Sequence, residues 1–419
     1  MPTRSVRSVP VRTATVRTVA VVAAAALAPL VVAIVPAGSP ASAALHDGQG
    51  DGGAHDHGGP LTARTILSGS SLTHSFTPAR ASAPTSEPLT KPDDITRLGR
   101  DIFVGFQNGV GPQGEPSTPS GNVDSTVVEV TPSGLLVAQW DIVGKVDGLT
   151  ADPESQTIVA TVNEDANSSL YTITPGSGGG VQHYSYNEPL PHNGGTDAIS
   201  VLDGRLYISA SAPGTTGTLS APQPTFPAVY TVTLDPSTSV ATVTPLFNDE
   251  DPAVVANVGT PQTGQTVPLA LTDPDSSEIV PRDAPRFGGE FMLDSQGDQQ
   301  QIFVSPWDHE LSVLNLTQSV DDTAWPGEDG GVLYATDSTN DAVDVVTGAF
   351  PERPVVAVTP CGANSAPSTC SATPATPVNY LGSLNPWTGE VSMLTVGGVA
   401  FVPQGGLLFT DGRDGGGHE

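Results

Sequence analysis

The sequence predicts an all-β protein, a six-bladed β-propeller whose ring is closed by an N-terminal strand. Three features of the chain lead to this prediction. Glycine and proline are frequent, with 46 and 40 residues among 419, and helices do not run through that density of breakers. Apolar side chains alternate with a period of two in many short runs. A unit made of an acid, one small step, an apolar residue and then strands recurs along the chain.

Short strands are predicted wherever an alternating apolar run is bounded by Gly, Pro, Asp or Asn. The clearest runs are 157–162, 169–175, 205–211, 228–234, 301–306, 311–316 and 332–337. No window has a helical period that competes with them. We therefore expect a chain built of strands and turns.

The recurring unit has the length of a propeller blade, about 50 residues with three or four antiparallel strands. Its starts are Asp93, Asp147, Asp197, Glu290 and Asp322, and a sixth start at Gly398 keeps the apolar step without the acid. Blades must stack around an axis, and the ring must close. The last unit ends too early for a full blade, so residues 62–76 are predicted to supply its outer strand. The long gap after Asp197 holds either an insertion or a degenerate blade, which makes seven blades the alternative.

Both ends of the chain are predicted to lie outside the propeller domain, 62–412. Residues 1–43 combine a basic leader, an apolar run over 19–35 and a small-residue cleavage site, as a secretory signal peptide does. A retained membrane anchor is the alternative, and the proline within the apolar run disfavours it. The Gly- and His-rich segment 44–61 and the tail 413–419 are expected to be disordered. We expect a secreted monomer without membrane contact after cleavage.

The charge balance excludes one class of partner. The chain has 44 acidic and 15 basic residues, for a formal net charge of −29 at pH 7. Nucleic-acid binding is not expected, because it needs Lys and Arg to displace phosphate counterions. The excess of carboxylates instead favours cations. We expect the partner to be a small molecule or another extracellular component.

The chain has two cysteines, Cys361 and Cys370. In an exported protein, two cysteines at this spacing predict a disulfide that closes a small loop. A metal site and a reactive thiol are the alternatives. The loop contains no histidine that would support a metal site.

The steps DGLTADP (147–153) and VLDGRLYISAS (201–211) resemble those of six- and seven-bladed propellers of the NHL-type, gluconolactonase-like and streptogramin-lyase-like group. Stretches such as 163–180 and 189–201 are also similar to secreted proteins of high-GC Gram-positive bacteria without an assigned activity. Gluconolactonase-like enzymes hold a metal with a Glu, Asn and Asp set, which has no residue-by-residue counterpart here. The lyase-like pattern uses a His and acid pair, for which His192 is the counterpart.

Five acids at the unit starts are the candidate metal ligands: Asp93, Asp147, Asp197, Glu290 and Asp322. The first strand of each blade lines the central channel, so these acids are predicted to point to one mouth. Clustered carboxylates raise one another's pKa unless a cation compensates, and Ca²⁺ with its oxygen ligands is the natural compensator. The alternative is that each acid caps a turn by accepting hydrogen bonds from backbone N–H groups.

His192 is the candidate catalytic residue, because it lies five residues before Asp197 on a Gly-rich loop. An imidazole there suits a general base or a metal ligand, and a structural or solvated histidine is the alternative. Glu164 is a more distant candidate for the acid partner.

Two further stretches match metal-binding patterns only in part. DPDSSE (273–278) has the alternating acids of a calcium loop but lacks its glycine and its bidentate Glu, so we expect a solvated acidic loop. His46, His55 and His57 lie in the N-terminal tail and would make at most a loose site. No nucleophile elbow, zinc-protease, P-loop or CxxC motif occurs. We expect ligand or partner binding at the channel mouth, with a metal-dependent hydrolase, lactonase or lyase as the alternative.

Overall fold

Antiparallel sheets account for nearly all secondary structure in the described chain, as the all-β prediction requires. The structure is a computed structural model, and it describes residues 59–410 except 79–80, 119, 177–178, 215–224, 306, 327–330 and 360–378. The predicted signal peptide, the His-rich tail, the C-terminal tail and the pair Cys361 and Cys370 lie outside the described residues. The described residues all belong to one compact unit, to which the description below applies.

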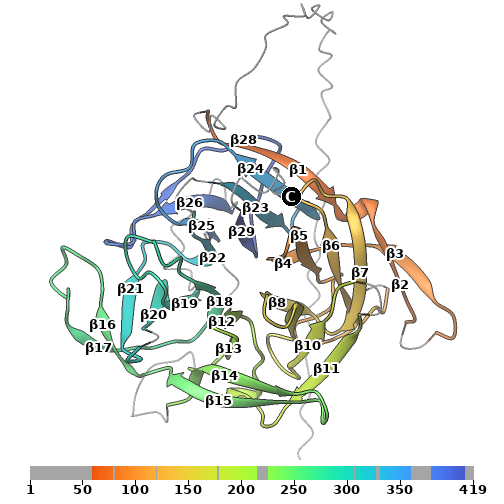
Figure 1. Cartoon of the computed structure of the whole chain (residues 1–419), viewed down its shortest axis with the longest axis horizontal. Helices are drawn as coiled ribbons and strands as arrows, with labels where there is room; N and C mark the ends of the chain where they lie inside the picture. The colour runs from red at the N-terminus through yellow and green to blue at the C-terminus, as the bar shows by residue number, and fades with distance from the viewer. Residues whose placement is uncertain are drawn as a thin grey trace, which may run out of the picture. The chain divides into compact units, whose positions relative to one another are not determined.

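The first three blades follow chain order from the centre outward (Figure 1). Blade one consists of β4 (Pro92–Leu98), β5 (Asp101–Phe106), β6 (Asp124–Val130) and β7 (Leu136–Val143). Blade two consists of β8 (Val146–Asp152), β9 (Thr157–Val162), β10 (Ser169–Ile173) and β11 (Val181–Tyr186). Blade three consists of β12 (Ile199–Leu202), β13 (Arg205–Ser209), β14 (Pro227–Asp235) and β15 (Val240–Asn248). The outer strands β11 and β15 pair in parallel, which joins blades two and three into one eight-stranded sheet.

Blade four corrects the predicted start of the fourth unit. It consists of β18 (Pro274–Ile279), β19 (Phe291–Ser295), β20 (Gln300–Val304) and β21 (Leu311–Asn315). Glu290 therefore precedes the second strand, and the DPDSSE stretch forms most of the innermost strand instead of a solvated loop. The apolar pattern predicts β19 because β19 is buried along its whole length, whereas β18 is only partly buried and polar.

The long insertion extends blade four at its outer edge. It forms a hairpin of β16 (Pro252–Val255) and β17 (Thr266–Pro268), and β16 pairs in parallel with the outer strand β21. The hairpin is thus part of a six-stranded sheet. Among the described residues this segment does not form a separate blade.

Blades five and six are interlaced along the chain. Blade five consists of β22 (Val320–Ala324), β25 (Val355–Val358), β26 (Tyr380–Leu384) and β27 (Val391–Met393). Blade six consists of β29 (Leu407–Thr410), β23 (Val332–Asp337), β24 (Ala342–Thr347) and β1 (Thr62–Ser68), and β28 (Gly397–Gly398) pairs in parallel with β1. The predicted unit that starts at Asp322 therefore does not continue into β23 and β24, and the predicted start at Gly398 does not begin an inner strand. Apolar alternation locates a strand but does not say which strand it pairs with.

A strand near the N-terminus closes the ring, as predicted, but it spans only residues 62–68 of the predicted 62–76, and residues 73–76 lie in a separate hairpin. β1 pairs antiparallel with β24, with Thr62 opposite Thr347 and Ser68 opposite Ala342. The inner strands contact one another in a closed circle in the order β4, β8, β12, β18, β22, β29 and back to β4. Dividing the eight-stranded sheet at the β11–β15 contact gives six blades within the described part, so the blade number depends on that division.

Residues just before the predicted boundary at residue 62 also contact the propeller. The amide of Ala349 donates a hydrogen bond to the Gly59 carbonyl, and Leu61 is buried. The apolar core lies between neighbouring blades: one cluster combines Val128 of blade one with Val343 of blade six. Each fully buried Val, Leu, Ile or Phe contributes about 1.5–3 kcal/mol. The described chain contains no helix long and apolar enough to cross a membrane, only the single 3₁₀ turns η1 (Gly69–Ser71) and η2 (Pro191–Asn193).

A separate hairpin of β2 (Thr73–Phe76) and β3 (Thr85–Pro88) lies against the outer strand of blade one. The Gln139 side chain on β7 donates a hydrogen bond to the Thr73 carbonyl at 3.1 Å. His74 is buried, with Nε2 3.3 Å from Glu87 Oε1 and Nδ1 3.6 Å from Asp141 Oδ1. The second distance is that of an ion pair and is too long for a hydrogen bond.

The hairpin contact is expected to stabilise the protein more in acid than in base. Burial lowers the pKa of His74, but the charges of Asp141 and Glu87 and the hydrogen bond with Glu87 outweigh it, and the net shift is upward. A histidine with a raised folded pKa contributes stability that is complete below its unfolded pKa, about 6.5, and is lost as pH rises through the folded value. His74→Gln should therefore lower the melting temperature more at pH 5.5 than at pH 8.5.

His183→Gln is the matched control for this prediction. Burial lowers the pKa of His183, so this histidine opposes folding as the pH falls. The substitution should remove that effect, so the pH dependence of its melting temperature should have the opposite sign. An equal loss at both pH values for His74→Gln would contradict the ion-pair interpretation.

Candidate functional site

The recurring acid at each unit start is explained by a bulge in the innermost strand. The strand register shifts between Pro92 and Ile95, Val146 and Leu149, Pro274 and Ser277, and Val320 and Asp322. The unpaired extra residue of a bulge redirects a side chain, and here that side chain is an acid. The acids at these shifts, with one equivalent acid just before β12, form what we call the acid ring: Asp93, Asp147, Asp197, Asp275 and Asp321.

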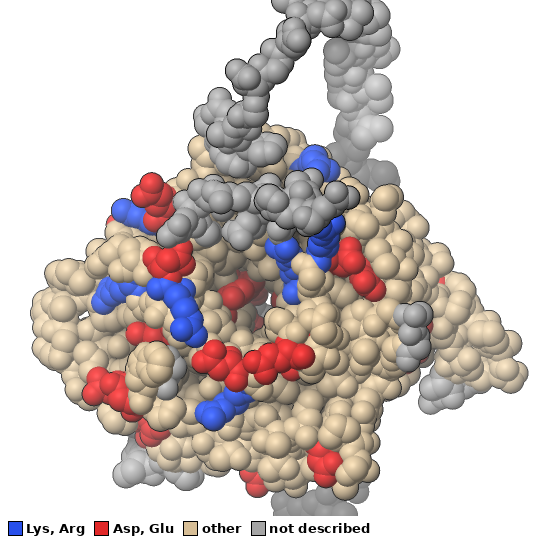
Figure 2. All heavy atoms as spheres, viewed as in Figure 1, with Lys and Arg blue, Asp and Glu red and all other residues tan. Residues whose placement is uncertain are grey.

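All five members of the acid ring line one central cavity of about 2070 Å³. Figure 2 shows acidic side chains inside the hollow at the centre of this face. The sixth blade has no acid at the equivalent position: Gly405 stands before β29, and its amide donates a hydrogen bond to Asp321 Oδ2. The missing acid of the sixth unit was visible in the sequence.

The structure brings three of the five predicted ligands into the acid ring, namely Asp93, Asp147 and Asp197. Asp322 lines the cavity but follows the ring member Asp321 by one residue. Glu290 is not among the cavity-lining residues, because it precedes the second strand of its blade.

Asp322 accepts hydrogen bonds from backbone N–H groups, as the turn-capping alternative predicts. Its two oxygens accept hydrogen bonds from the amides of Thr323 at 2.7 Å and Leu407 at 2.6 Å. Asp94 does the same between blades one and two, accepting from the amides of Ile95 and Leu149. Each acid joins its own strand to the next inner strand, so these two carboxylates fasten neighbouring blades.

Three carboxylates on one side of the cavity form the tightest group, which we call the carboxylate trio. It consists of Asp147, Glu164 and Asp197, and one oxygen of each lies within 4.8 Å of the other two. Asp147 lies on β8 and Glu164 on the loop after β9, whereas Asp197 comes from blade three. The trio therefore spans the boundary between blades two and three.

Small residues let the two blades approach closely enough to form the trio. A Cβ on Gly148 would lie 2.2 Å from the Asp197 carbonyl oxygen, a distance that real side chains do not show. The amide of Gly195 and the hydroxyl of Ser211 both donate to the Glu164 carbonyl, which fixes the loop that carries Glu164. Thr161 Oγ1 donates to the Asp197 carbonyl at 3.0 Å.

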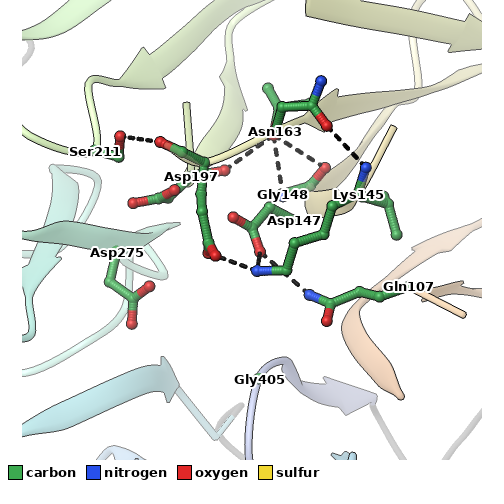
Figure 3. A network of polar contacts seen from close by, with 12 residues as sticks. Gln107, Lys145, Asp147, Gly148, Asn163, Asp197, Ser211, Asp275 and Gly405 are labelled. Carbon is green, nitrogen blue, oxygen red and sulfur yellow. Dashed lines mark hydrogen bonds and ion pairs between the residues drawn. The ribbon is translucent and has the colours of Figure 1, made fainter. Parts of the chain in front are cut away.

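Lys145 places a positive charge within the trio. Its Nζ lies 2.6 Å from Glu164 Oε2 and 3.3 Å from Asp147 Oδ1. Gln107 Nε2 donates to the same Asp147 oxygen at 3.3 Å. Figure 3 shows Lys145, Asp147 and Gln107 directed toward one another, with Asp275 across the channel.

Burial and mutual repulsion raise the pKa values of these acids. Burial raises the pKa of Asp93 and of Glu164 to about 7. It raises the pKa of Asp147 to about 6, with Lys145 opposing the shift. The pKa of Asp197 lies well above its usual range through burial and the charges of Asp147 and Glu164. At neutral pH the trio thus holds its full negative charge only when cations compensate it.

Two oxygens of the trio are buried without a hydrogen-bond donor among the described residues. They are Asp147 Oδ2 and Asp197 Oδ1. A buried acceptor without a partner costs about 1–3 kcal/mol, and such atoms point to a ligand or an ion. On the other side of the ring, the side-chain amide of Gln296 donates these hydrogen bonds. Its Nε2 lies 2.9 Å from Asp275 Oδ2 and 2.6 Å from Asp321 Oδ1.

His192 lines the same cavity in the 3₁₀ turn η2, with a left-handed φ of 58°. Its Nδ1 donates a hydrogen bond to the Ala212 carbonyl at 2.7 Å, and its ring lies edge-on to Phe226. This leaves Nε2 as the nitrogen suited to accept a proton. Within the described residues no hydrogen bond joins His192 to the trio.

Sequence reasoning missed Lys145, Asp275 and Asp321 and ranked Glu164 too low. A signal was present for Asp321, because the pair at 321–322 repeats the pair at 93–94, and in both pairs the first acid faces the ring. Asp275 lies in the DPDSSE stretch, whose alternating acids suggest a calcium loop but not a channel-lining strand, since that strand lacks apolar alternation. Lys145 is a single charge two residues before Asp147, and only the fold shows what it contacts.

Comparisons with known proteins return solved propellers but no sequence relative. No family model and no curated protein matches the chain. The periplasmic gluconolactonase of Pseudomonas aeruginosa covers 83% of this chain and 99% of its own at 12% identity and a TM-score of 0.40. A protein of unknown function from Bacteroides caccae covers 80% of this chain and 93% of its own at 9% identity and a TM-score of 0.38. At these scores the likeness does not bear on the site or the activity. The protein is a β-propeller by its own strand topology.

Proposed function

We propose that this protein is a secreted propeller that binds a divalent cation, Ca²⁺ in the first instance, at Asp147, Glu164 and Asp197. The observation that carries the proposal is the pair of buried trio oxygens without a donor, Asp147 Oδ2 and Asp197 Oδ1. Carboxylate oxygens alone suit a hard cation that takes six to eight oxygen ligands. The trio differs from Asp94 and Asp322, whose oxygens accept backbone amides.

The bound cation would present open coordination positions to a small molecule in the channel. The cavity volume of about 2070 Å³ exceeds the roughly 300–1,000 Å³ of ordinary ligand pockets. Three protein carboxylates leave several positions of a calcium ion for water or for ligand oxygens. We therefore propose a ligand rich in hydroxyl or carboxylate oxygens, held by the cation from one side.

A second candidate function is metal-dependent hydrolysis of an ester or lactone, and the position of His192 favours it. The imidazole lines the same cavity, and its Nδ1–H is held by the Ala212 carbonyl. That contact leaves Nε2 to accept a proton from a water molecule. Turnover of simple lactones by the Ca²⁺-loaded protein, and its loss in His192→Gln, would favour catalysis over binding alone.

The cation site is tested by calorimetric titration and thermal melting of chelator-treated protein. Ca²⁺ is expected to bind and to raise the melting temperature, because an ion a hundredfold above its Kd adds about 2.7 kcal/mol to the folded state. Replacing both Asp147 and Asp197 by Asn should abolish the response and raise stability in chelator, since repulsion between the acids is relieved. Asp283→Asn removes the same charge from an exposed position and should leave the response intact. Identical melting of the wild-type protein in chelator and in millimolar Ca²⁺ would reject the site.

A further inference from the structure

We propose that Lys145 is a tethered counter-ion, which a divalent cation must displace in order to bind the carboxylate trio. This inference rests on the cation site proposed above. It states that one side chain, that of Lys145, lowers the affinity of the site for the cation. A lysine two residues before Asp147 matches no recognised cation-binding motif, and only its contacts in the fold suggest the role.

The ammonium of Lys145 already occupies the place of a cation. Its side chain is 13% exposed, and its Nζ contacts Glu164 Oε2 at 2.6 Å and Asp147 Oδ1 at 3.3 Å. A calcium ion binds carboxylate oxygens at about 2.3–2.6 Å. An ion bound to these two oxygens would therefore share them with Nζ, and two positive charges so close together repel each other.

Lys145 compensates only part of the trio. It contacts Asp147 and Glu164, whereas Asp197 Oδ1 is buried and has no donor in the described part of the chain. One positive charge thus stands against three carboxylates, and a divalent ion would satisfy the oxygens that the ammonium leaves. Lys145 thus neutralises part of the trio, and the negative charge that remains still attracts a divalent ion.

The side chain of Lys145 can leave while its backbone stays fixed. Its amide donates to Asn163 Oδ1 at 2.9 Å, and its carbonyl accepts from the amide of Asn163 at 2.8 Å. The flexible four-carbon stem allows the ammonium to turn. Asp93 of the neighbouring blade is near enough for its charge to act on Lys145, so the displaced ammonium has a second acid of the ring to approach.

Calorimetric titration of the chelator-treated full chain with Ca²⁺ alone tests the inference. Lys145→Met keeps the length of the stem without the charge and should bind Ca²⁺ at least tenfold more tightly than the wild-type protein. Lys91→Met is the matched control, because Lys91 lines the same cavity but is exposed; its affinity should stay within twofold. Circular-dichroism melts confirm folding of each variant, and Lys145→Gln replaces Lys145→Met if the latter fails to fold.

The outcomes separate this inference from the cation site itself. Unchanged or weaker binding by a folded Lys145→Met, with binding by the wild-type protein, overturns the counter-ion role and keeps the site. Absence of binding by both proteins overturns the site. Binding by Lys145→Met alone supports the counter-ion role and rejects Ca²⁺ as a ligand of the natural chain.

Amine labelling of the wild-type protein gives a readout that needs no variant. Mass spectrometry after brief acylation should show Lys145 protected in chelator and more heavily labelled with Ca²⁺, because displacement frees its Nζ. Labelling of Lys91 should not change. Lower labelling of Lys145 in the presence of Ca²⁺ would overturn displacement.

Discussion

Deletion of residues 44–68 is expected to unfold the protein, whereas deletion of residues 44–58 is expected to leave its melting temperature nearly unchanged. The longer deletion removes β1, the strand that closes the ring by pairing with β24 along its whole length. The shorter one removes only residues of the Gly- and His-rich segment that the sequence predicts to be disordered. Circular-dichroism melting and size-exclusion chromatography of both variants measure the difference.

The expected loss is large in relation to the stability of a typical domain. Removing β1 and the residue before it exposes the core contacts of Leu61, Ala63 and Leu67. Each buried leucine contributes about 1.5–3 kcal/mol, and each of several ladder hydrogen bonds adds about 1 kcal/mol. Total stabilities are about 5–15 kcal/mol. The unpaired edge of β24 would also favour aggregation, so equal melting temperatures for the two deletions would contradict closure by β1.

The sequence predicts the middle strands of each blade better than the innermost ones. β5 and β9 are buried along nearly their whole length, so their apolar residues stand out. β4 and β18 are polar and partly buried, because one face borders the channel. The residues that line the site therefore carry the weakest pattern, which is why Glu290 was chosen and Asp275 missed.

The order in which the strands pair could not be predicted from the sequence, for a different reason. The strand predicted at 332–337 is β23, yet the β23–β24 hairpin pairs with β29 and β1 from the two ends of the chain. Their apolar pattern is compatible with a place in blade five or in blade six. Only the closing of the ring, which removes exposed edges, decides between the two, and it acts on the whole chain at once.

The acid of each repeated unit has two different uses, and the bulge separates them. Asp93 and Asp321 face the ring, whereas the next acids, Asp94 and Asp322, accept amides from the neighbouring inner strand. The turn-cap interpretation thus applies to Asp94 and Asp322, whereas a metal-ligand role stays a prediction for the acids before them. In blade two, Gly148 stands in place of the second acid. Because glycine has no side chain, blade three can come close enough for the trio to form.

Gly148→Ala is expected to lower the free energy of unfolding by about 2–3 kcal/mol and to weaken Ca²⁺ binding with it. The new Cβ would meet the Asp197 carbonyl oxygen at 2.2 Å and Thr161 Oγ1 at 2.8 Å. The first of these atoms is backbone and cannot turn aside, so blade three must move away from blade two. That movement takes Asp197 away from Asp147, which is why stability and cation affinity should fall together.

Urea unfolding and calcium titration of the same variant measure both effects. Gly180→Ala is the control, because a Cβ at Gly180 has no atom within 4 Å; its stability should stay within about 0.5 kcal/mol of the wild-type protein. If Gly148→Ala is as stable as Gly180→Ala and binds Ca²⁺ as the wild-type protein does, then the blades tolerate the extra methyl group. In that case the glycine after the acid has no part in forming the trio, and the close approach of blades two and three is not what creates the site.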